Sequence, residues 1–178
     1  MDIQIRSFFV TFVSRCIQAA DCTKADDALI KARSMVNEQE DALDSFLNCF
    51  IKEWEVDSSG LTIITKPMKH ELFYDALSDN HYGKDFPMNK RNNRYEIGCA
   101  TIHIPIQSLS PIITFDNQEF VHGHITEGQI NCWGKYKTIS KTVLHEGPLA
   151  ALGAMYGFCK YSRYGTYLKS NAPEPANA

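Results

Sequence analysis

Residues 51–65, with the sequence IKEWEVDSSGLTIIT, contain the point at which the hydrophobic pattern of the chain changes. Two short β-rich runs, 54–56 and 61–65, flank the cluster DSSG, whose residues favour a tight turn. These runs predict a β-hairpin. Because the apolar residues upstream recur with the period of a helix, we expect an α+β chain, with helices before the hairpin and a sheet after it.

Two helices are predicted before the hairpin. The first carries one wide apolar stripe, made by Ile5, Phe8, Phe9, Phe12, Val13, Cys16 and Ile17. Thr23, followed three positions later by Asp26, is typical of a helix N-cap, so the second helix is expected to start at Lys24. Its helical period runs to about Lys52 through Leu29, Ala32, Val36, Leu43, Phe46, Leu47, Phe50 and Ile51. The two helices are expected to be antiparallel.

The rest of the chain is predicted to form mostly β-structure. Pro67 suits the first turn of a short helix over 67–77, and residues 78–94 are interpreted as a long surface loop. Strands are predicted at 95–106, 111–115, 118–126, 129–133 and 136–143, with Asp116-Asn117 as a two-residue turn. A last helix opens at Gly147-Pro148, and its Gly153 and Gly157 are interpreted as close packing on the sheet. The fold predicted is a helical pair and a C-terminal helix packed on an antiparallel sheet of about five or six strands.

Composition limits the class of protein. With 178 residues, 44% of them hydrophobic and 22% charged, the chain predicts a single domain over 1–170 and a flexible tail over 171–178. No run approaches the roughly 20 apolar residues that cross a bilayer, so we expect a soluble protein without a membrane partner. The six cysteines are scattered and include no CxxC pair, which is typical of reduced thiols in a cytoplasm.

A histidine cluster is the strongest chemical motif. His122 and His124 share one face of a predicted strand, and Glu127 follows at its end. Two imidazoles and a carboxylate are a plausible ligand set for a divalent metal, and His103 on a neighbouring strand would add a third nitrogen. The set indicates a small hydrolase or phosphoesterase that uses these residues through a metal ion or by direct acid/base chemistry. The competing interpretation is that they are ordinary strand histidines, and we expect no cofactor beyond that metal.

Two families resemble this motif in part. The first cupin motif also has H-x-H followed by a carboxylate and a glycine, here Gly134, but the gap from His124 to Glu127 is one residue shorter. The chain also shows no second cupin motif. His124-Ile125-Thr126 resembles one H-x-[ST] tripeptide of the two-histidine phosphoesterases, whereas His103-Ile104-Pro105 lacks the hydroxyl residue. We assign the chain to neither family.

Charge is distributed unevenly along the chain. Residues 1–57 hold 6 basic and 11 acidic side chains, within a net charge of −3, whereas residues 149–169 hold no acidic residue. Tyrosines and cations alternate in this last segment, and the loop at 78–94 is also basic. The candidate binding residues are Lys90, Arg91, Arg94, Lys160, Tyr161, Arg163 and Tyr164. Such residues can stack on bases and neutralise phosphates, so nucleic-acid binding is one hypothesis. The favoured hypothesis is a non-enzymatic binding or regulatory module with a protein partner, because charge separation orients an encounter.

Overall fold

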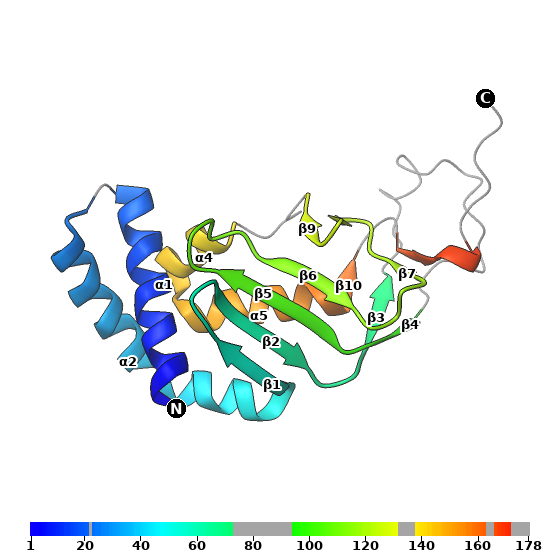
Figure 1. Cartoon of the computed structure of the whole chain (residues 1–178), viewed down its shortest axis with the longest axis horizontal. Helices are drawn as coiled ribbons and strands as arrows, with labels where there is room; N and C mark the ends of the chain where they lie inside the picture. Colours follow the sequence, from blue (N-terminus) through cyan, green and yellow to red (C-terminus); the bar gives the residue numbers. More distant parts are fainter. Residues whose placement is uncertain (22, 73–93, 132–137, 163–165, 172–178) are drawn as a thin grey trace.

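A computed structural model describes the chain except for residues 22, 73–93, 132–137, 163–165 and 172–178. Residues 78–93 of the predicted loop (78–94) and residues 172–178 of the predicted tail (171–178) therefore lie outside the described residues, as do Lys90, Arg91, Arg163 and Tyr164. The architecture is the predicted α+β arrangement of an N-terminal helical pair and a C-terminal helix on an antiparallel sheet (Figure 1). Among the described residues, none of the helices is long and apolar enough to cross a membrane.

The N-terminal pair consists of α1 (Ile3–Asp21) and α2 (Ala25–Phe50). The predicted stripe of α1 is confirmed, since all seven of its residues are buried. The N-cap of α2 is Lys24, which makes no capping hydrogen bond through its side chain, so the prediction of Thr23 as the cap is wrong. The helix ends at Phe50 and the chain enters the sheet at Ile51, which the apolar period assigns to the helix.

The main sheet has six antiparallel strands in the order β1-β2-β5-β6-β9-β8. Their bounds are β1 Ile51–Val56, β2 Gly60–Thr65, β5 Ala100–Pro105, β6 Ile112–Phe115, β8 Ile125–Thr126 and β9 Gln129–Ile130. The predicted hairpin is confirmed as β1–β2. Asp57 closes it, because its Oδ1 accepts hydrogen bonds from the main-chain N–H groups of Ser59 and Gly60 and from the Ser59 hydroxyl.

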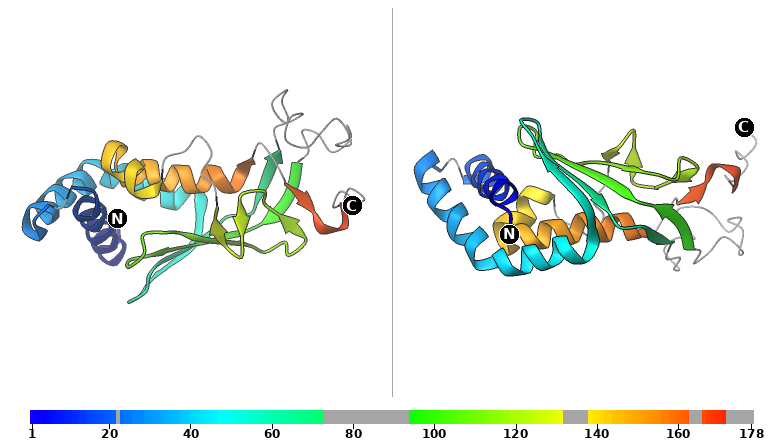
Figure 2. Two further views of the ribbon diagram at one scale, coloured as in Figure 1. Left: turned by 90° about the horizontal axis from the view of Figure 1, so that it is seen from above. Right: turned by 60° about the horizontal axis from the view of Figure 1, so that its bottom comes forward.

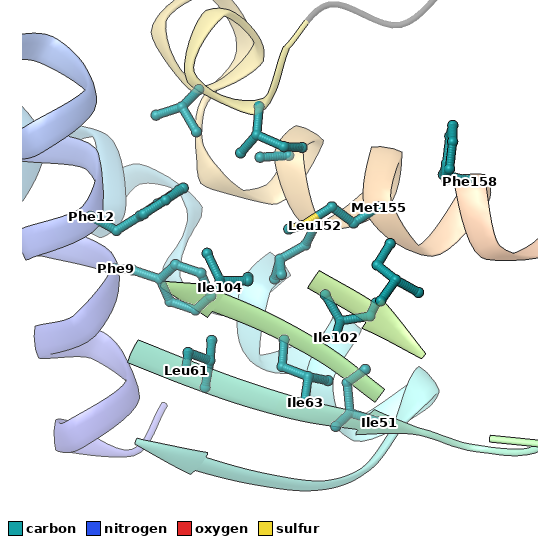
Figure 3. Close-up of a cluster of buried hydrophobic side chains, with 14 of the residues drawn as sticks. Phe9, Phe12, Ile51, Leu61, Ile63, Ile102, Ile104, Leu152, Met155 and Phe158 are labelled. Carbon is teal, nitrogen blue, oxygen red and sulfur yellow. The ribbon is translucent and has the colours of Figure 1, made fainter. Parts of the chain in front are cut away.

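Two helices follow the sheet, α4 (Ile139–Glu146) and α5 (Pro148–Lys160). Both lie against one face of the sheet, and the described residues place no helix on the opposite face (Figures 1 and 2). Figure 3 shows the core between these layers, where Leu152 and Met155 of α5 face Ile63 and Ile102 of the sheet. Phe9 of α1 points into the same core.

Two smaller sheets lie beyond the main one. One has the order β10-β3-β4, formed by β10 Tyr161–Ser162, β3 Met68–Leu72 and β4 Arg94–Gly98. The other pairs β7 Phe120–Val121 with β11 Tyr167–Leu168, which leads into a 3₁₀ turn, η2 Lys169–Asn171. Together they surround the C-terminal end of α5.

Several segments differ from their sequence predictions. The predicted strand 118–126 divides into β7 and β8, which belong to different sheets. Residues 68–72, predicted as helix, form β3, in which Met68, His70 and Leu72 are buried at alternate positions; residues 73–77 lie outside the described chain. The predicted strand 95–106 divides at Gly98, whose φ of 67° ends β4 before β5 begins in the other sheet. Residues 139–143, predicted as strand, begin α4. Ile139, Thr142 and Val143 are β-branched, which favoured a strand, but they are buried at helical spacing.

The turn at Asp116-Asn117 does not close the predicted hairpin. β6 pairs with β5 and β9, and β7 pairs with β11. Asp116 Oδ2 instead accepts a hydrogen bond from the Cys99 main-chain N–H at 3.2 Å, and Asn117 Nδ2 donates to the Glu96 carbonyl at 2.8 Å. These bonds fold the chain back over the β4–β5 junction.

The small residues of α5 do not pack as predicted. No described atom lies within 4 Å of the position that a Cβ would take at Gly153 or Gly157. The face of α5 toward the sheet carries larger side chains, among them Leu152 and Met155. The interpretation of these glycines as close packing on the sheet is therefore wrong.

Gln39 joins α2 to the α4–α5 junction. Its Nε2 donates to the Glu146 carbonyl at 2.9 Å, and its Oε1 accepts from the Leu149 N–H at 3.0 Å. We expect Gln39→Ala to lower the free energy of unfolding by about 1 to 3 kcal/mol, because both main-chain groups lose a partner. Urea denaturation measures the change, with Glu38→Ala on the exposed neighbouring position as the control. A Gln39→Ala protein as stable as this control would contradict the expectation.

Candidate functional site

His122 lies directly after β7 and is buried, with 3% of its surface exposed. Its Nε2 is 2.9 Å from the Phe158 carbonyl, which can only accept, so this nitrogen carries the proton. Its Nδ1 accepts from the His124 main-chain N–H at 3.1 Å. Burial, and then the neighbouring His70, lower the pKa of His122 to about 3. The ring is therefore neutral, and main-chain groups occupy both of its nitrogens.

His70, on β3, is a second buried histidine that the sequence did not single out. Its Nδ1 donates to the Cys159 carbonyl at 2.7 Å, which leaves Nε2 as an acceptor in the neutral ring. The Ser162 and Thr166 hydroxyls lie 2.9 and 3.2 Å from Nε2 and are hydrogen-bonded to each other. Burial lowers the pKa of His70 to about 4.

The two histidines cap the same helix end. Phe158 and Cys159 belong to the last turn of α5, whose carbonyls lack partners within the helix. The rings of His70 and His122 meet edge to face with centroids 4.9 Å apart, and Phe158 stacks on His122 at 4.7 Å. We call His70, His122, Ser162 and Thr166 the histidine cluster. Its exposed fractions of 0, 3, 7 and 0% show a packed polar core that joins β3 and the β7 segment to α5.

Of the other predicted metal ligands, His124 lies beside this core, whereas Glu127 and His103 are placed elsewhere. His124 is half-buried, with its ring 6.0 Å from that of His122, and Glu127 is exposed in a turn with φ of 51°. His103 is on the face of the sheet opposite the helices, because its neighbours Ile102 and Ile104 fill the core, and its Nδ1 is 3.0 Å from the Thr62 hydroxyl. Over the described part of the chain, no three His, Cys, Asp or Glu residues are arranged to hold a metal ion.

A second cluster lies at the surface, where the C-terminal ends of α2 and α5 meet. Phe50 contacts Phe46 and Tyr156, with ring centroids 5.0 and 4.9 Å apart, and Phe46 meets Tyr156 edge to face at 5.7 Å. Lys160 Nζ lies 5.7 Å from the Tyr156 ring and 5.5 Å from the Tyr161 ring, within the range of a cation–π contact. We call these five residues the aromatic–lysine surface.

The aromatic–lysine surface is partly open to solvent. Phe50 is 40% exposed and Tyr161 is 39% exposed, values unusual for large apolar side chains in this chain. Desolvation raises the pKa of Tyr156, and the nearby Lys160 opposes that rise, so this hydroxyl is neutral. The surface therefore combines preformed aromatic contacts with one positive charge.

Lys66 borders the same surface. Its main-chain N–H donates to the Phe50 carbonyl at 2.9 Å, and its Nζ donates to the Asn48 and Cys49 carbonyls at 2.8 and 2.9 Å. These carbonyls are at the negative end of the α2 dipole, so a cation is favourable there. The lysine thus caps α2 and adds a second positive charge beside Phe50.

The structure places only some of the predicted binding residues on this surface. Lys160 and Tyr161 belong to it, whereas Arg94 is exposed on β4 and forms a salt bridge with Glu71 at 2.9 Å. Phe46 and Phe50 were predicted only as members of the apolar period of the second helix. The last turns of α2 pack on α5 rather than on α1. The position of the two rings at the end of a long apolar stripe was the available signal that they leave the α1–α2 interface.

Comparison of the chain with family models, with curated proteins and with solved structures gave no match.

Proposed function

We propose that the chain is a non-enzymatic binding module that binds another protein through the aromatic–lysine surface. The observation that supports this proposal is the exposure of Phe50 and Tyr161 at the edge of a set of packed rings. Aromatic residues are enriched among the residues that dominate the binding energy of protein interfaces. Because the rings of Phe46, Phe50 and Tyr156 already pack on one another, little side-chain entropy is lost when a partner covers them.

The hydrolase hypothesis has less support. Both ring nitrogens of His122 are occupied by main-chain groups, so the ring would have to break a hydrogen bond before it could bind a metal or a proton. His103 lies on the other face of the sheet. A metal-dependent or acid/base activity of His122, His124 and Glu127 stays a hypothesis that metal analysis of the purified protein would examine.

Substitution of Phe50 is the test of the proposed function. Phe50→Ser removes an exposed ring, and we expect affinity for the captured partner to fall roughly thirtyfold, or about 2 kcal/mol. The control is Ile30→Ser, which removes another exposed apolar side chain, 66% exposed, from the same helix. The measurement is capture from native lysate treated with nuclease, followed by titration of the captured protein.

Three results would count against the proposal. Equal capture by the Phe50→Ser and Ile30→Ser proteins would move the binding site away from this surface. Capture that disappears with nuclease would indicate nucleic acid as the ligand. A chain that recovers no stoichiometric protein would leave no partner for the module.

A further inference from the structure

We infer that the partner presents an acidic segment with aliphatic side chains to the aromatic–lysine surface. This inference rests on the proposed function and goes beyond it by specifying the chemistry of the partner. The chemistry of the partner is inferred from the lysines that border the surface and from whether carboxylates of the chain neutralise them.

The two lysines at the surface lack carboxylate partners among the described residues, whereas four other described lysines and arginines have one. Salt bridges join Arg6 to Glu40, Lys52 to Glu53, Lys69 to Glu96 and Arg94 to Glu71. Within the described chain, no such pair includes Lys66 or Lys160. Lys66 contacts main-chain carbonyls, and Lys160 contacts two tyrosine rings. Neither cation is therefore neutralised by a carboxylate of the described residues.

The carboxylates nearest in sequence to Phe50 are Glu53, which pairs with Lys52 at 2.9 Å, and Glu55, both on β1. Residues 147–171 contain no Asp or Glu, so α5 and the segment after it add no negative charge. On α2 the nearest acidic residue before Phe46 is Asp44, which is about 200° around the helix from Phe46 at roughly 100° per residue. Asp44 accepts a hydrogen bond from Asn48 at 3.2 Å. Lys66 and Lys160 therefore add two positive charges at the aromatic–lysine surface, which the negative ends of the α2 and α5 dipoles offset in part, within a chain of net charge −3.

A carboxylate alone would gain little here, because an exposed ion pair contributes about 0 to 1 kcal/mol. The rings contribute more to affinity, since burying the exposed parts of Phe50 and Tyr161 removes apolar area from water. A segment that binds both features needs aliphatic side chains to cover the rings and carboxylates to reach Lys66 and Lys160. Charge then selects the segment, and apolar contact supplies affinity.

Nucleic acid fits these charges less well. A polyanion would reach two lysines here but would also approach the acidic N-terminal part of the chain, where residues 1–57 hold 11 acidic side chains. A short acidic peptide avoids that repulsion, since charges beyond about 8 Å are largely screened at physiological salt. The observations therefore favour a protein segment.

Three synthetic peptides of equal length test the inference on the full chain. One contains leucine and glutamate, the second has lysine in place of each glutamate, and the third has serine in place of each leucine. Fluorescence anisotropy gives the three affinities. We expect the leucine–glutamate peptide to bind at least roughly tenfold more tightly than either of the others, and its affinity to fall as salt rises.

A charge-swapped variant makes the test specific to this surface. In the Lys66→Glu, Lys160→Glu protein we expect the preference to reverse, so that the leucine–lysine peptide binds more tightly. Lys52→Glu, Lys69→Glu is the matched control, because these lysines already form salt bridges elsewhere. The control is expected to keep the preference of the unmodified chain.

The outcomes separate this inference from the proposed function. Three peptide results would overturn the inference. They are equal affinity for the acidic and basic peptides, no binding of the leucine–glutamate peptide, and a preference that the charge swap leaves unchanged. Tighter binding of a single-stranded oligonucleotide, or self-association that is lost in Phe50→Ser, would overturn it as well. The proposed function stands in the first three cases if the captured protein still depends on Phe50, and it fails if that dependence is absent.

Discussion

Acidification below neutral pH is expected to destabilise the fold steeply, because His70 and His122 are buried in their neutral forms. The pKa values of about 4 and about 3 lie below the ordinary histidine value of 6.5. Well above pH 6.5 neither the folded nor the unfolded chain protonates these rings, so their contribution to stability is complete. As the pH falls below 6.5, the unfolded chain takes up protons that the folded chain does not. The free energy of unfolding then drops by about 1.4 kcal/mol per pH unit for each histidine, until the folded pKa is reached.

The geometry of the two rings adds to this loss of folding stability at low pH. Two imidazolium rings with centroids 4.9 Å apart would repel each other, and a protonated His122 could no longer accept the His124 N–H at Nδ1. At His70, protonation would change Nε2 from an acceptor into a donor, so the Ser162 and Thr166 hydroxyls would have to reorient. We therefore expect the end of α5, β3 and the β7 segment to open first.

His122→Gln separates this effect from the titration of carboxylates. A glutamine can still donate to the Phe158 carbonyl and accept from the His124 N–H, but it does not titrate. Urea denaturation between about pH 7 and pH 4.5 is expected to show a shallower loss of stability for His122→Gln than for the unmodified chain. His145→Gln, at an exposed histidine of α4, is the control and should match the unmodified chain. Identical pH dependence in all three proteins would contradict the role assigned to the histidine cluster.

Replacing Gly60 is expected to damage the pairing of β2 with β5. A Cβ at this position would lie 2.1 Å from the Ile104 carbonyl oxygen and 3.0 Å from Pro105 Cα. These are main-chain atoms of β5, the strand that pairs with β2, so no side chain can move aside. The φ of Gly60, 158°, adds strain for any residue with a Cβ. We expect Gly60→Ala to lower the free energy of unfolding by about 4 kcal/mol or more.

Gly153→Ala is the matched control for this substitution. It makes the same change inside α5, where no described atom lies within 4 Å of the new Cβ. Alanine has a higher helix propensity than glycine, so we expect this variant to be unchanged or up to about 1 kcal/mol more stable. Urea denaturation of both proteins measures the difference. If Gly60→Ala were as stable as Gly153→Ala, the close approach of β2 and β5 would be refuted.

The elements that the sequence predicted well are those with a strong local signal. The stripe of α1 is wide and regular, and the DSSG cluster specifies its own turn through Asp57, so both were confirmed. The predictions for the segments that form β3 and α4 were wrong, because a short apolar segment fits a helix and a strand equally. Tertiary packing decides between the two. In β3 the decisive contact is that of His70 with Cys159, 89 positions later in the chain.

Prediction of the candidate sites was limited by the same long-range pairing. His122 was singled out as a metal ligand, but its partner is a helix end that no local motif reveals. Lys160 and Tyr161 were identified because they lie in a segment without acidic residues. Phe50 was missed, since a periodic stripe does not show where the core stops and the surface begins.

Alkylation of Cys49 in the captured complex tests the proposed binding surface most directly. Cys49 is exposed and precedes Phe50, whereas Cys16, Cys99 and Cys159 are buried. Site-resolved mass spectrometry gives the alkylation rate of Cys49 in the free chain and in the complex at saturating partner. A partner on the aromatic–lysine surface should slow this rate at least roughly tenfold, through loss of access to the thiol. An unchanged Cys49 rate in the saturated complex would contradict binding at this surface.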